Sequence, residues 1–359
     1  MPRATINLGE STGQKLNILM IGGTRYMGKI MVEQLLERGD RVTVFSRGVS
    51  RPEWWDQVAH IRGDRNDQCD FRSKLAGKCF DAVIDTQAYK KEDVECAVNA
   101  IQGNVGRYLL LSTSSVYLEG MVDFRDHCPY DESLVDWNSL KYDYPPGEDP
   151  YAVGKRHCEK WLDENSTVPY TIIRVPAVMG PDDPTGRMWW WVQRALDGAR
   201  VIIPTDSLGA FRTLYSQDAA TNLIRALDSD QTVNQTCFVG MPEIMTIERW
   251  AQLIWTAAGN ECQISYVPRD VIRKHPKLKS YAPPLTRPVA NIHDLSKAQR
   301  LIGIVATPVE QWVQQTVDWY RDTYRGADSE GYEFRNEELA LATKWEERYR
   351  RLVTEFGYP

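Results

Sequence analysis

Short apolar runs alternate with longer amphipathic stretches along the first half of the chain. The run LNILMIG at 16–22 is rich in Ile and Leu, which predicts a buried parallel strand. The stretch 27–40 carries apolar residues at helical spacing and ends at Gly39, a helix stop signal. Further strands are predicted at 41–48, 80–88, 107–115 and 170–180, and a helix at 93–103. Strands that alternate with helices predict an α/β fold with a parallel sheet covered on both faces.

The pattern changes after Gly180. We expect a sheet domain over 16–180, to which later segments return, and a smaller lobe over 181–325 that closes over the sheet. The last part, 326–359, contains an amphipathic helix with a charged face. We expect this helix to be a structural cap, with partner binding as the alternative. The first sixteen residues are polar and lack an apolar signal core, which predicts a loose extension.

Composition narrows the class of protein. Apolar residues make up 42% of the chain and charged residues 26%, as in ordinary soluble globular proteins. The net charge of -6 and the lack of a long basic run weigh against a nucleic-acid binder. No apolar run approaches the ~20 residues that span a membrane. Seven cysteines without a C-x-x-C pair indicate the reducing cytoplasm, and the histidines show no metal-ligand spacing, so no metal is expected.

Glycines gather directly after the first predicted strand, in GGTRYMG. Gly22 permits a tight turn, and Gly28 lets the following helix lie close to the sheet. The helix N-terminus then offers free N–H groups and a partial positive charge to a pyrophosphate. The alternative is a plain tight turn. The loop residues predicted to contact a dinucleotide cofactor are Gly22, Gly23, Thr24, Arg25, Tyr26, Met27 and Gly28.

Two arginines bear on the choice of cofactor. Arg25 stands where a turn glycine is usual, and its guanidinium can pair with a phosphate oxygen while its N–H still faces the loop. The second strand ends in Ser46 and Arg47 where NAD enzymes usually place an acid for the ribose 2′-OH. Because Arg47 attracts a 2′-phosphate, NADP is favoured over NAD; a solvated surface arginine is the alternative. Asp64, after the third strand, is a candidate for the adenine amino group.

A tyrosine and a lysine four residues apart carry the candidate chemistry. Tyr151 and Lys155 share one face of a helix, and an ammonium near a phenol lowers the phenol pKa from about 10. Such a tyrosine exchanges a proton with an alcohol while a hydride moves to or from a nicotinamide. The pair follows a strand that ends in hydroxyls, LLLSTSSVY at 109–117. A core tyrosine is the alternative, since Y-x-x-x-K alone is a weak signal.

The sequence resembles an extended or atypical short-chain dehydrogenase/reductase of the NAD-dependent epimerase/dehydratase family. The matching elements are GGTRYMG, GDRND, STSSVY, PYAVGK, IIRVPAVMGPDDPTGR and NIHDLSKAQRLIG, in the family's order between about 16 and 325. The resemblance implies a Rossmann doubly wound parallel sheet with a smaller C-terminal substrate-binding lobe. It also implies NAD or NADP as the cofactor.

The resemblance supplies a role for each site residue. Tyr151 is expected to be the general acid/base, Lys155 to lower its pKa and bind the nicotinamide ribose, and Thr113 to lie where the family has its catalytic Ser or Thr. Val175 and Val178 are expected to line the nicotinamide. Further cofactor contacts are expected at Arg65, Thr86 and Gln87, and substrate contacts at Ser114, Ser115, Trp189 and Arg212.

The chain departs from the family at several points. GGTRYMG, FSRG and GDRND resemble the branch of the chloroplast stem-loop binding proteins, which often lacks the active tyrosine that this chain keeps. The usual His-x-Ala-Ala after the fourth strand reads DTQA at 85–88. Arg212 lies six residues before Asp218, where sugar-nucleotide epimerases have seven. Trp189 and its two neighbours open a helix, and packing is the alternative to stacking on a substrate.

Three functions remain open at this stage. One is a redox-neutral epimerase or dehydratase acting on a small molecule, a nucleotide sugar among the candidates. Another is a net NADPH-dependent reductase of a ketone. The third is a non-catalytic, RNA-binding or regulatory protein, which the acidic balance and the Thr113, Tyr151 and Lys155 set oppose. We expect a small-molecule substrate and neither nucleic acid nor membrane as partner; a homodimer stays open.

Overall fold

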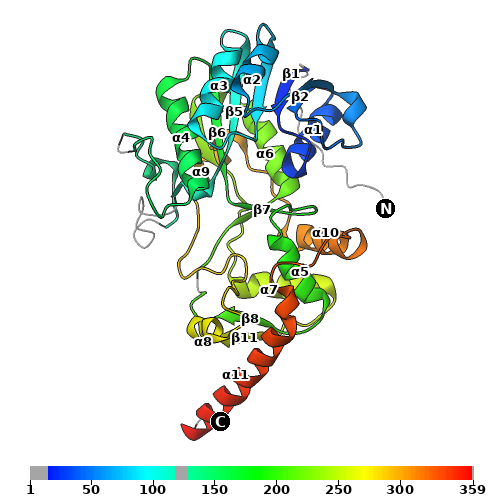
Figure 1. Cartoon of the computed structure of the whole chain (residues 1–359), viewed down its shortest axis with the longest axis vertical. Coiled ribbons are helices and arrows are strands. Elements are labelled where there is room, and N and C mark those ends of the chain that lie inside the picture. Colours follow the sequence, from blue (N-terminus) through cyan, green and yellow to red (C-terminus); the bar gives the residue numbers. More distant parts are fainter. Residues whose placement is uncertain (1–14, 118–127, 139, 208, 358–359) are drawn as a thin grey trace.

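A seven-stranded parallel sheet forms the centre of the larger domain (Figure 1). The computed structural model describes residues 15–117, 128–138, 140–207 and 209–357. The strand order is β10-β6-β5-β4-β1-β2-β3, and every pair in it is parallel. Its strands are β1 (Asn17–Ile21), β2 (Arg41–Ser46), β3 (Ala59–Arg62), β4 (Phe80–Asp85), β5 (Val105–Thr113), β6 (Tyr170–Val175) and β10 (Gln235–Phe238). This confirms the expected Rossmann-type sheet.

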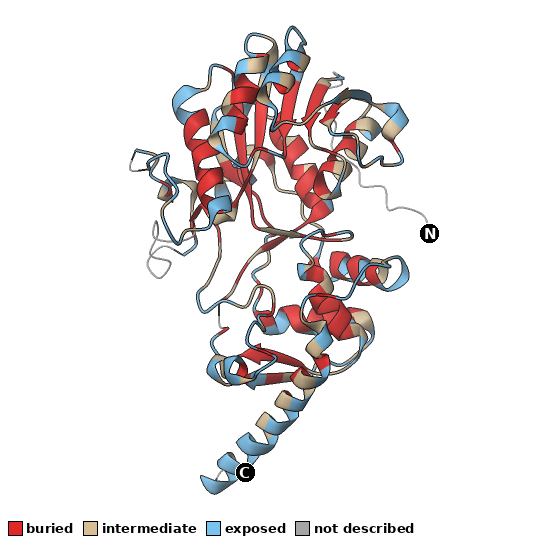
Figure 2. Ribbon diagram, in the orientation of Figure 1, coloured by how far each residue is buried: buried red, intermediate tan, exposed pale blue. Residues whose placement is uncertain are grey.

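Helices cover both faces of the sheet, as the alternating pattern predicts. One face carries α1 (Tyr26–Arg38), α6 (Ser216–Asp228) and α9 (Ser296–Ile302); the other carries α2 (Gln68–Leu75), α3 (Lys91–Ile101) and α4 (Pro150–Asn165). Figure 2 shows the strands buried between the two helical layers. The helix α1 ends at Gly39, whose φ of 92° is the left-handed value that favours glycine at a helix end. The predicted stop is therefore confirmed.

The predicted strand at 170–180 is wrong in one respect, because it is two strands. The first, β6, ends at Val175, and β7 (Ala177–Met179) follows after Pro176. Proline has no N–H for the ladder, so a strand does not run through it in the middle of a sheet. The short β7 leaves the central sheet and pairs instead with β9 (Thr213–Tyr215). This bend carries the chain toward the lobe.

The lobe is packed around tryptophans. Its core gathers Trp190, Trp191, Trp250, Trp255 and Trp312 with aliphatic side chains. The elements are α5 (Arg187–Leu196), α7 (Ile247–Ala258), α8 (Arg269–Lys274), α10 (Val309–Asp322) and the parallel pair β8 (Val201–Pro204) and β11 (Ile264–Val267). Between these segments the chain returns to the large domain as α6, β10 and α9. The sheet domain therefore includes residues well beyond 180.

The last helix, α11 (Arg335–Glu355), leaves the lobe at its far end (Figure 1). Its first turns contact β8 and β11, and Ala342 is buried there. Within the part of the chain that the structure describes, no helix is both long and apolar enough to cross a membrane.

Candidate active site

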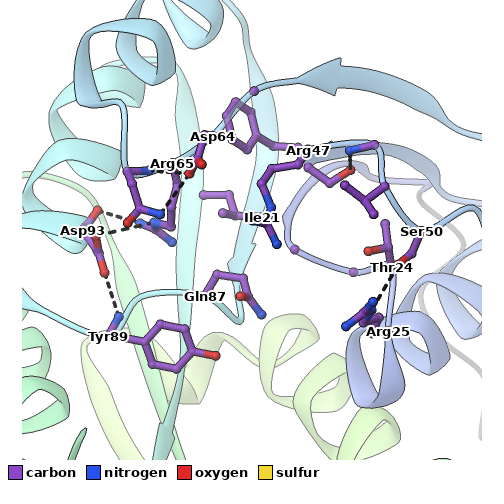
Figure 3. Close-up of a pocket in the computed structure, with 18 of the residues that line it drawn as sticks. Ile21, Thr24, Arg25, Arg47, Ser50, Asp64, Arg65, Gln87, Tyr89 and Asp93 are labelled. Carbon is purple, nitrogen blue, oxygen red and sulfur yellow. Dashed lines mark hydrogen bonds and ion pairs between the residues drawn. The ribbon is translucent and has the colours of Figure 1, made fainter. Parts of the chain in front are cut away.

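A cavity of about 690 Å³ opens at the carboxyl edge of the sheet, where β1, β2 and β4 end (Figure 3). This edge is where open α/β sheets bind ligands, at the point where the strand order reverses. The predicted cofactor residues that line the cavity are Gly22, Gly23, Thr24, Arg25, Ser46, Arg47, Asp64, Arg65 and Gln87. Residues from four separate stretches of sequence therefore meet around one space.

The glycines of the first loop sit where no side chain fits. A Cβ on Gly22 would come within 2.5 Å of Thr86 Oγ1, and its φ of 99° is left-handed. A Cβ on Gly28 would lie 2.9 Å from the Cα of Gly23. The N-terminus of α1 is thus drawn tightly against the loop. Thr86 itself donates to the carbonyl of Ile21 at 3.1 Å, which joins the β4 end to the same loop.

One side of the cavity carries Arg25, while Arg65 lies on the opposite side, beside Asp93 (Figure 3). Arg25 precedes α1 in an extended conformation, and its Nε donates to Ser50 Oγ at 3.1 Å. Figure 3 shows Thr24, Arg25 and Ser50 together on this side, with Tyr89 and Asp93 on the other. A smaller cavity of about 340 Å³ adjoins the first and is lined by Arg47, Arg62 and Lys74 among others. The end of β2 therefore faces a positively charged space.

Arg65 lines the cavity, but its guanidinium is already engaged. Its Nη1 donates to both carboxylate oxygens of Asp85 at 2.7 and 2.8 Å, and its Nη2 donates to the carbonyl of Asp93 at 2.8 Å. Tyr108 donates its hydroxyl to the same Asp85 at 2.7 Å. Asp85 is fully buried, so this network ties β4 to α3. The guanidinium of Arg65 thus links β4 to α3 beside the cavity.

The helix α4 presents Tyr151 at the edge of the site. Asp149 caps the helix by accepting from the N–H of Tyr151 at 3.0 Å, and Pro150 occupies the first turn. The Tyr151 side chain is 41% exposed. Burial still raises the pKa of its phenol, while the hydroxyl of Thr113 and the charge of Arg187 lower it; the net direction is upward. The phenol is therefore held in its protonated form.

Lys155 lies one turn further along α4 and is 2% exposed. Its Nζ donates to the carbonyl of Leu111 at 2.8 Å and lies 4.9 Å from the centre of the Tyr89 ring. Burial lowers the pKa of Lys155. The ammonium of Lys155 is directed to β5, and desolvation is the largest effect on the Tyr151 phenol, so the lowering of that pKa by Lys155 stays a prediction. The shared helix face is as predicted.

The family of the chain is shown by comparison with known proteins. The sequence pattern of the NAD dependent epimerase/dehydratase family matches residues 18–240. The chain belongs to this family. The expected NAD(P)-dependent enzyme type and Rossmann fold are thereby confirmed, and the family is NAD-dependent in its description.

Individual relatives are distant. A chloroplast stem-loop binding protein of 41 kDa, form b, from Arabidopsis thaliana is 23% identical over 96% of this chain and 88% of its own. A 2′-dehydrokanamycin reductase from Streptomyces kanamyceticus is 26% identical over 64% of this chain and 63% of its own. Among solved structures, the UDP-glucose 4-epimerase of Thermotoga maritima with UDP-glucose superposes with a TM-score of 0.66 at 20% identity. It covers 86% of this chain and 99% of that one. The last likeness concerns the fold.

The remaining predicted site residues occupy mixed surroundings. Val175 is buried and Val178 partly buried, both within the core beside α6 and outside the lining of the main cavity. Ser115 donates its N–H to Thr113 Oγ1 at 3.1 Å and lies in the 3₁₀ turn Ser114–Tyr117. Tyr26 and Met27 lie at the start of α1, where Met27 is buried in the core. None of these described residues lines the main cavity.

Two predicted substrate residues are engaged in packing. Trp189 stacks on Tyr320 with ring centres 5.3 Å apart, and its indole N–H donates to the carbonyl of Ala327 at 3.0 Å. Trp189 therefore packs against neighbouring aromatic side chains, which was the alternative to stacking on a substrate. Arg212 donates to the carbonyls of Met241, at 3.0 Å, and of Pro242. Its Nη1 is therefore directed to the chain after β10, and Arg212 does not line the described cavity.

Sequence reasoning missed two residues beside Tyr151. Tyr89 places its ring 6.1 Å from that of Tyr151, and its N–H donates to Asp93 Oδ2 at 2.9 Å. Arg187, the first residue of α5, is exposed and its charge acts on the phenols of both Tyr151 and Tyr26. No local pattern marks either residue, because each meets Tyr151 only through the tertiary fold. Among the described residues no cluster of three or more His, Cys, Asp or Glu side chains is arranged to hold a metal.

Proposed function

We propose that this chain is an NADP-linked oxidoreductase that transfers hydride at a hydroxyl or carbonyl carbon of a small molecule. The observation that supports it best is the convergence of Thr113, Tyr151 and Lys155 on the sheet edge that also carries the glycine loop. A proton donor and a dinucleotide cavity then lie next to each other. The 2′-dehydrokanamycin reductase relative is a precedent for such chemistry on a related sequence.

The residues at the cavity fit a dinucleotide. Gly22 and Gly28 leave room at positions where a Cβ would collide with the chain, so a pyrophosphate can approach the backbone there. When bound, the nicotinamide supplies or accepts the hydride. Tyr151 then gives its proton to a carbonyl oxygen or takes one from a hydroxyl, and Thr113 orients that oxygen. Lys155 stabilises the phenolate that remains and contacts the nicotinamide ribose.

The preference for NADP rests on the positive space at the end of β2. Arg25, Arg47 and Arg62 border it, while Asp64, an acid that lines both cavities, accepts at Oδ1 from Asn66 at 2.9 and 3.0 Å. A 2′-phosphate is attracted by such a set, and a ribose 2′-OH has no free carboxylate at the end of β2 to bind it. We therefore place the 2′-phosphate beside Arg47.

Replacing Arg47 by aspartate is expected to weaken NADP binding by about a hundredfold and to leave NAD binding within about threefold. The change removes a charge-assisted bond of about 1–3 kcal/mol and adds repulsion. Isothermal titration of both cofactors gives the two dissociation constants. Arg41→Asp, the same change at the exposed opposite end of β2, is the matched control. Equal losses for NADP and NAD would show that the 2′-phosphate is bound elsewhere.

Replacing Arg25 by glycine is expected to weaken NADP binding by roughly ten- to a hundredfold, since 1.4 kcal/mol is a factor of ten. The loss should shrink as salt rises, because an exposed charge pair is screened. Arg25→Met separates charge from backbone freedom at the start of α1: both variants should lose the same affinity. If Arg25→Gly binds NADP as tightly as the unchanged protein at low salt, Arg25 is merely tolerated in the loop.

The amount of NADPH consumed per turnover distinguishes net reduction from redox-neutral epimerisation. Mass spectrometry of co-purifying cofactor separates a tightly held dinucleotide from an exchanging one. Arg212 bears on the same question, since its Nη1 is directed to backbone carbonyls and it lies six residues before Asp218. Asp218 is in turn bound to the N–H of Thr307 at 2.7 Å. This altered pair favours net reduction, which consumes one NADPH per turnover.

The nucleic-acid alternative is tested by filter binding of structured RNA at two salt concentrations.

A further inference from the structure

The second half of α11 stands away from the rest of the molecule (Figure 2). Its first half is firmly anchored in the lobe. Arg194 contacts Glu338 at 3.1 Å, and Arg335 contacts Asp197 and Glu338 at 2.8 and 2.6 Å. These groups are mostly buried, so they fix the direction in which the helix leaves. From about residue 346 onward nearly every residue is exposed.

An apolar stripe runs along this projecting part. It consists of Trp345, Tyr349, Leu352 and Phe356, and we call these four residues the seam; Trp345, at its lobe end, is partly buried against the core of the lobe. Their spacings of four, three and four residues are those of the a and d positions in a coiled coil. Tyr349 is 57% exposed, Leu352 50% and Phe356 71%. Three large apolar side chains exposed on one face of a helix indicate that this face packs on another helix.

The charges beside the seam are arranged in a self-complementary way. Arg348 and Glu355 lie on the same flank of the seam, one heptad apart. Both are exposed, and within the described residues neither makes an ion pair. A helix running antiparallel along the seam brings Arg348 of each chain opposite Glu355 of the other. The same surface therefore offers both halves of an ion pair to its own copy.

We propose that α11 is a self-association helix, whose seam packs antiparallel against the seam of a second copy of this chain. Tyr349 then lies opposite Leu352 of the second copy, and Trp345 opposite Phe356. Two such layers repeat by symmetry, as a two-fold interface requires. The lobe sits at one end of α11 (Figure 1), so only antiparallel packing keeps the two lobes at opposite ends of the pair. The inference is independent of the proposed enzymatic function.

The size of the seam sets the strength of the association. Four side chains from each copy and two flanking ion pairs between the copies form an interface smaller than the standard ~800 Å² per partner, which is the size class of weak, reversible association. Sedimentation velocity of the full chain over a hundredfold concentration range should show the molecular mass rising toward twice its low-concentration value.

Leu352→Asp tests the seam. This side chain is half exposed, so the variant is expected to fold, and circular dichroism checks that the helix content is kept. The dissociation constant should rise at least a hundredfold. The matched control is Arg351→Glu, which reverses a charge on the adjacent residue but off the seam; it should leave the mass profile unchanged. A mass profile that Leu352→Asp does not alter overturns the proposal.

A charge exchange tests the antiparallel register. Arg348→Glu and Glu355→Arg, made singly, each place like charges opposite one another and should weaken association about three- to tenfold. The double variant restores opposite charges and should recover the original constant. If the double variant associates as poorly as the sum of the single changes predicts, Arg348 and Glu355 do not face one another and the proposed register is overturned.

Discussion

Replacing Tyr151 by phenylalanine is expected to lower turnover by about a hundredfold or more while NADP affinity stays near its original value. The substitution removes one hydroxyl, which is the proposed proton donor, and general acid–base catalysis typically contributes 10²–10⁴-fold. The ring is 41% exposed at the start of α4 and lies outside the lining of the dinucleotide cavity. The loss should therefore appear in the chemical step and not in cofactor binding.

The measurement pairs single-turnover hydride transfer with titration of NADPH fluorescence. Tyr266→Phe is the matched control, since Tyr266 is 44% exposed on the lobe and its hydroxyl is bonded to Glu248. It should leave both quantities unchanged. Hydride transfer retained in Tyr151→Phe would remove Tyr151 from the mechanism, whereas loss of NADPH binding in this variant would indicate a structural role instead.

The direction of the pKa shift at Tyr151 predicts a pH dependence. Desolvation raises this pKa above its usual 10.0, so the phenol keeps its proton across the neutral range. Carbonyl reduction uses that proton and should be flat through neutrality, then fall as the pH rises through the raised pKa. Alcohol oxidation needs the phenolate and should rise over the same alkaline window. The two directions thus have opposite profiles.

Local patterns were enough to predict the sheet and the glycine loop. Buried parallel strands are continuous apolar runs, and Gly22 and Gly28 stand at a strand-to-helix turn, so neighbours in sequence carry the signal. Pro176 was also a local signal, and the strand drawn through it was wrong for that reason. The pairing of Tyr151 with Lys155 needed only helical spacing.

Contacts between residues far apart in the sequence could not be predicted from local patterns. Arg65 lines the cavity as predicted for a cofactor contact, but its guanidinium also binds Asp85, a buried partner 20 residues further along the chain that no local pattern marks. The Tyr89 ring lies 4.9 Å from the ammonium of Lys155, and the carbonyl of Tyr89 lies so close to Gly154, 65 residues further along the chain, that a Cβ there would come within 2.1 Å of it. Electrostatics at Tyr151 depend on such neighbours and on burial, which composition does not reveal.

Breaking the buried ion pair behind α4 with a single substitution is expected to cause a large loss of stability. Arg174, on β6, is fully buried and donates to Glu159 of α4 at 2.7 and 3.0 Å and to the hydroxyl of Tyr117 at 2.7 Å. Ser112 of β5 donates to the same Glu159. One carboxylate thus joins β5, β6 and the helix that carries the candidate acid/base.

Arg174→Leu is expected to lower the free energy of unfolding by about 3–5 kcal/mol, because it leaves the carboxylate of Glu159 buried without its cation. Urea denaturation followed by circular dichroism measures the change. Arg249→Leu is the matched control: its pair with Glu310 spans 2.6 Å, but the two side chains are 51% and 60% exposed. An exposed pair contributes roughly 0–1 kcal/mol.

The double variant Arg174→Leu/Glu159→Leu should recover much of the loss, since both charges are then gone. A loss in Arg174→Leu no larger than in the control would mean that the pair adds nothing to the anchoring of α4.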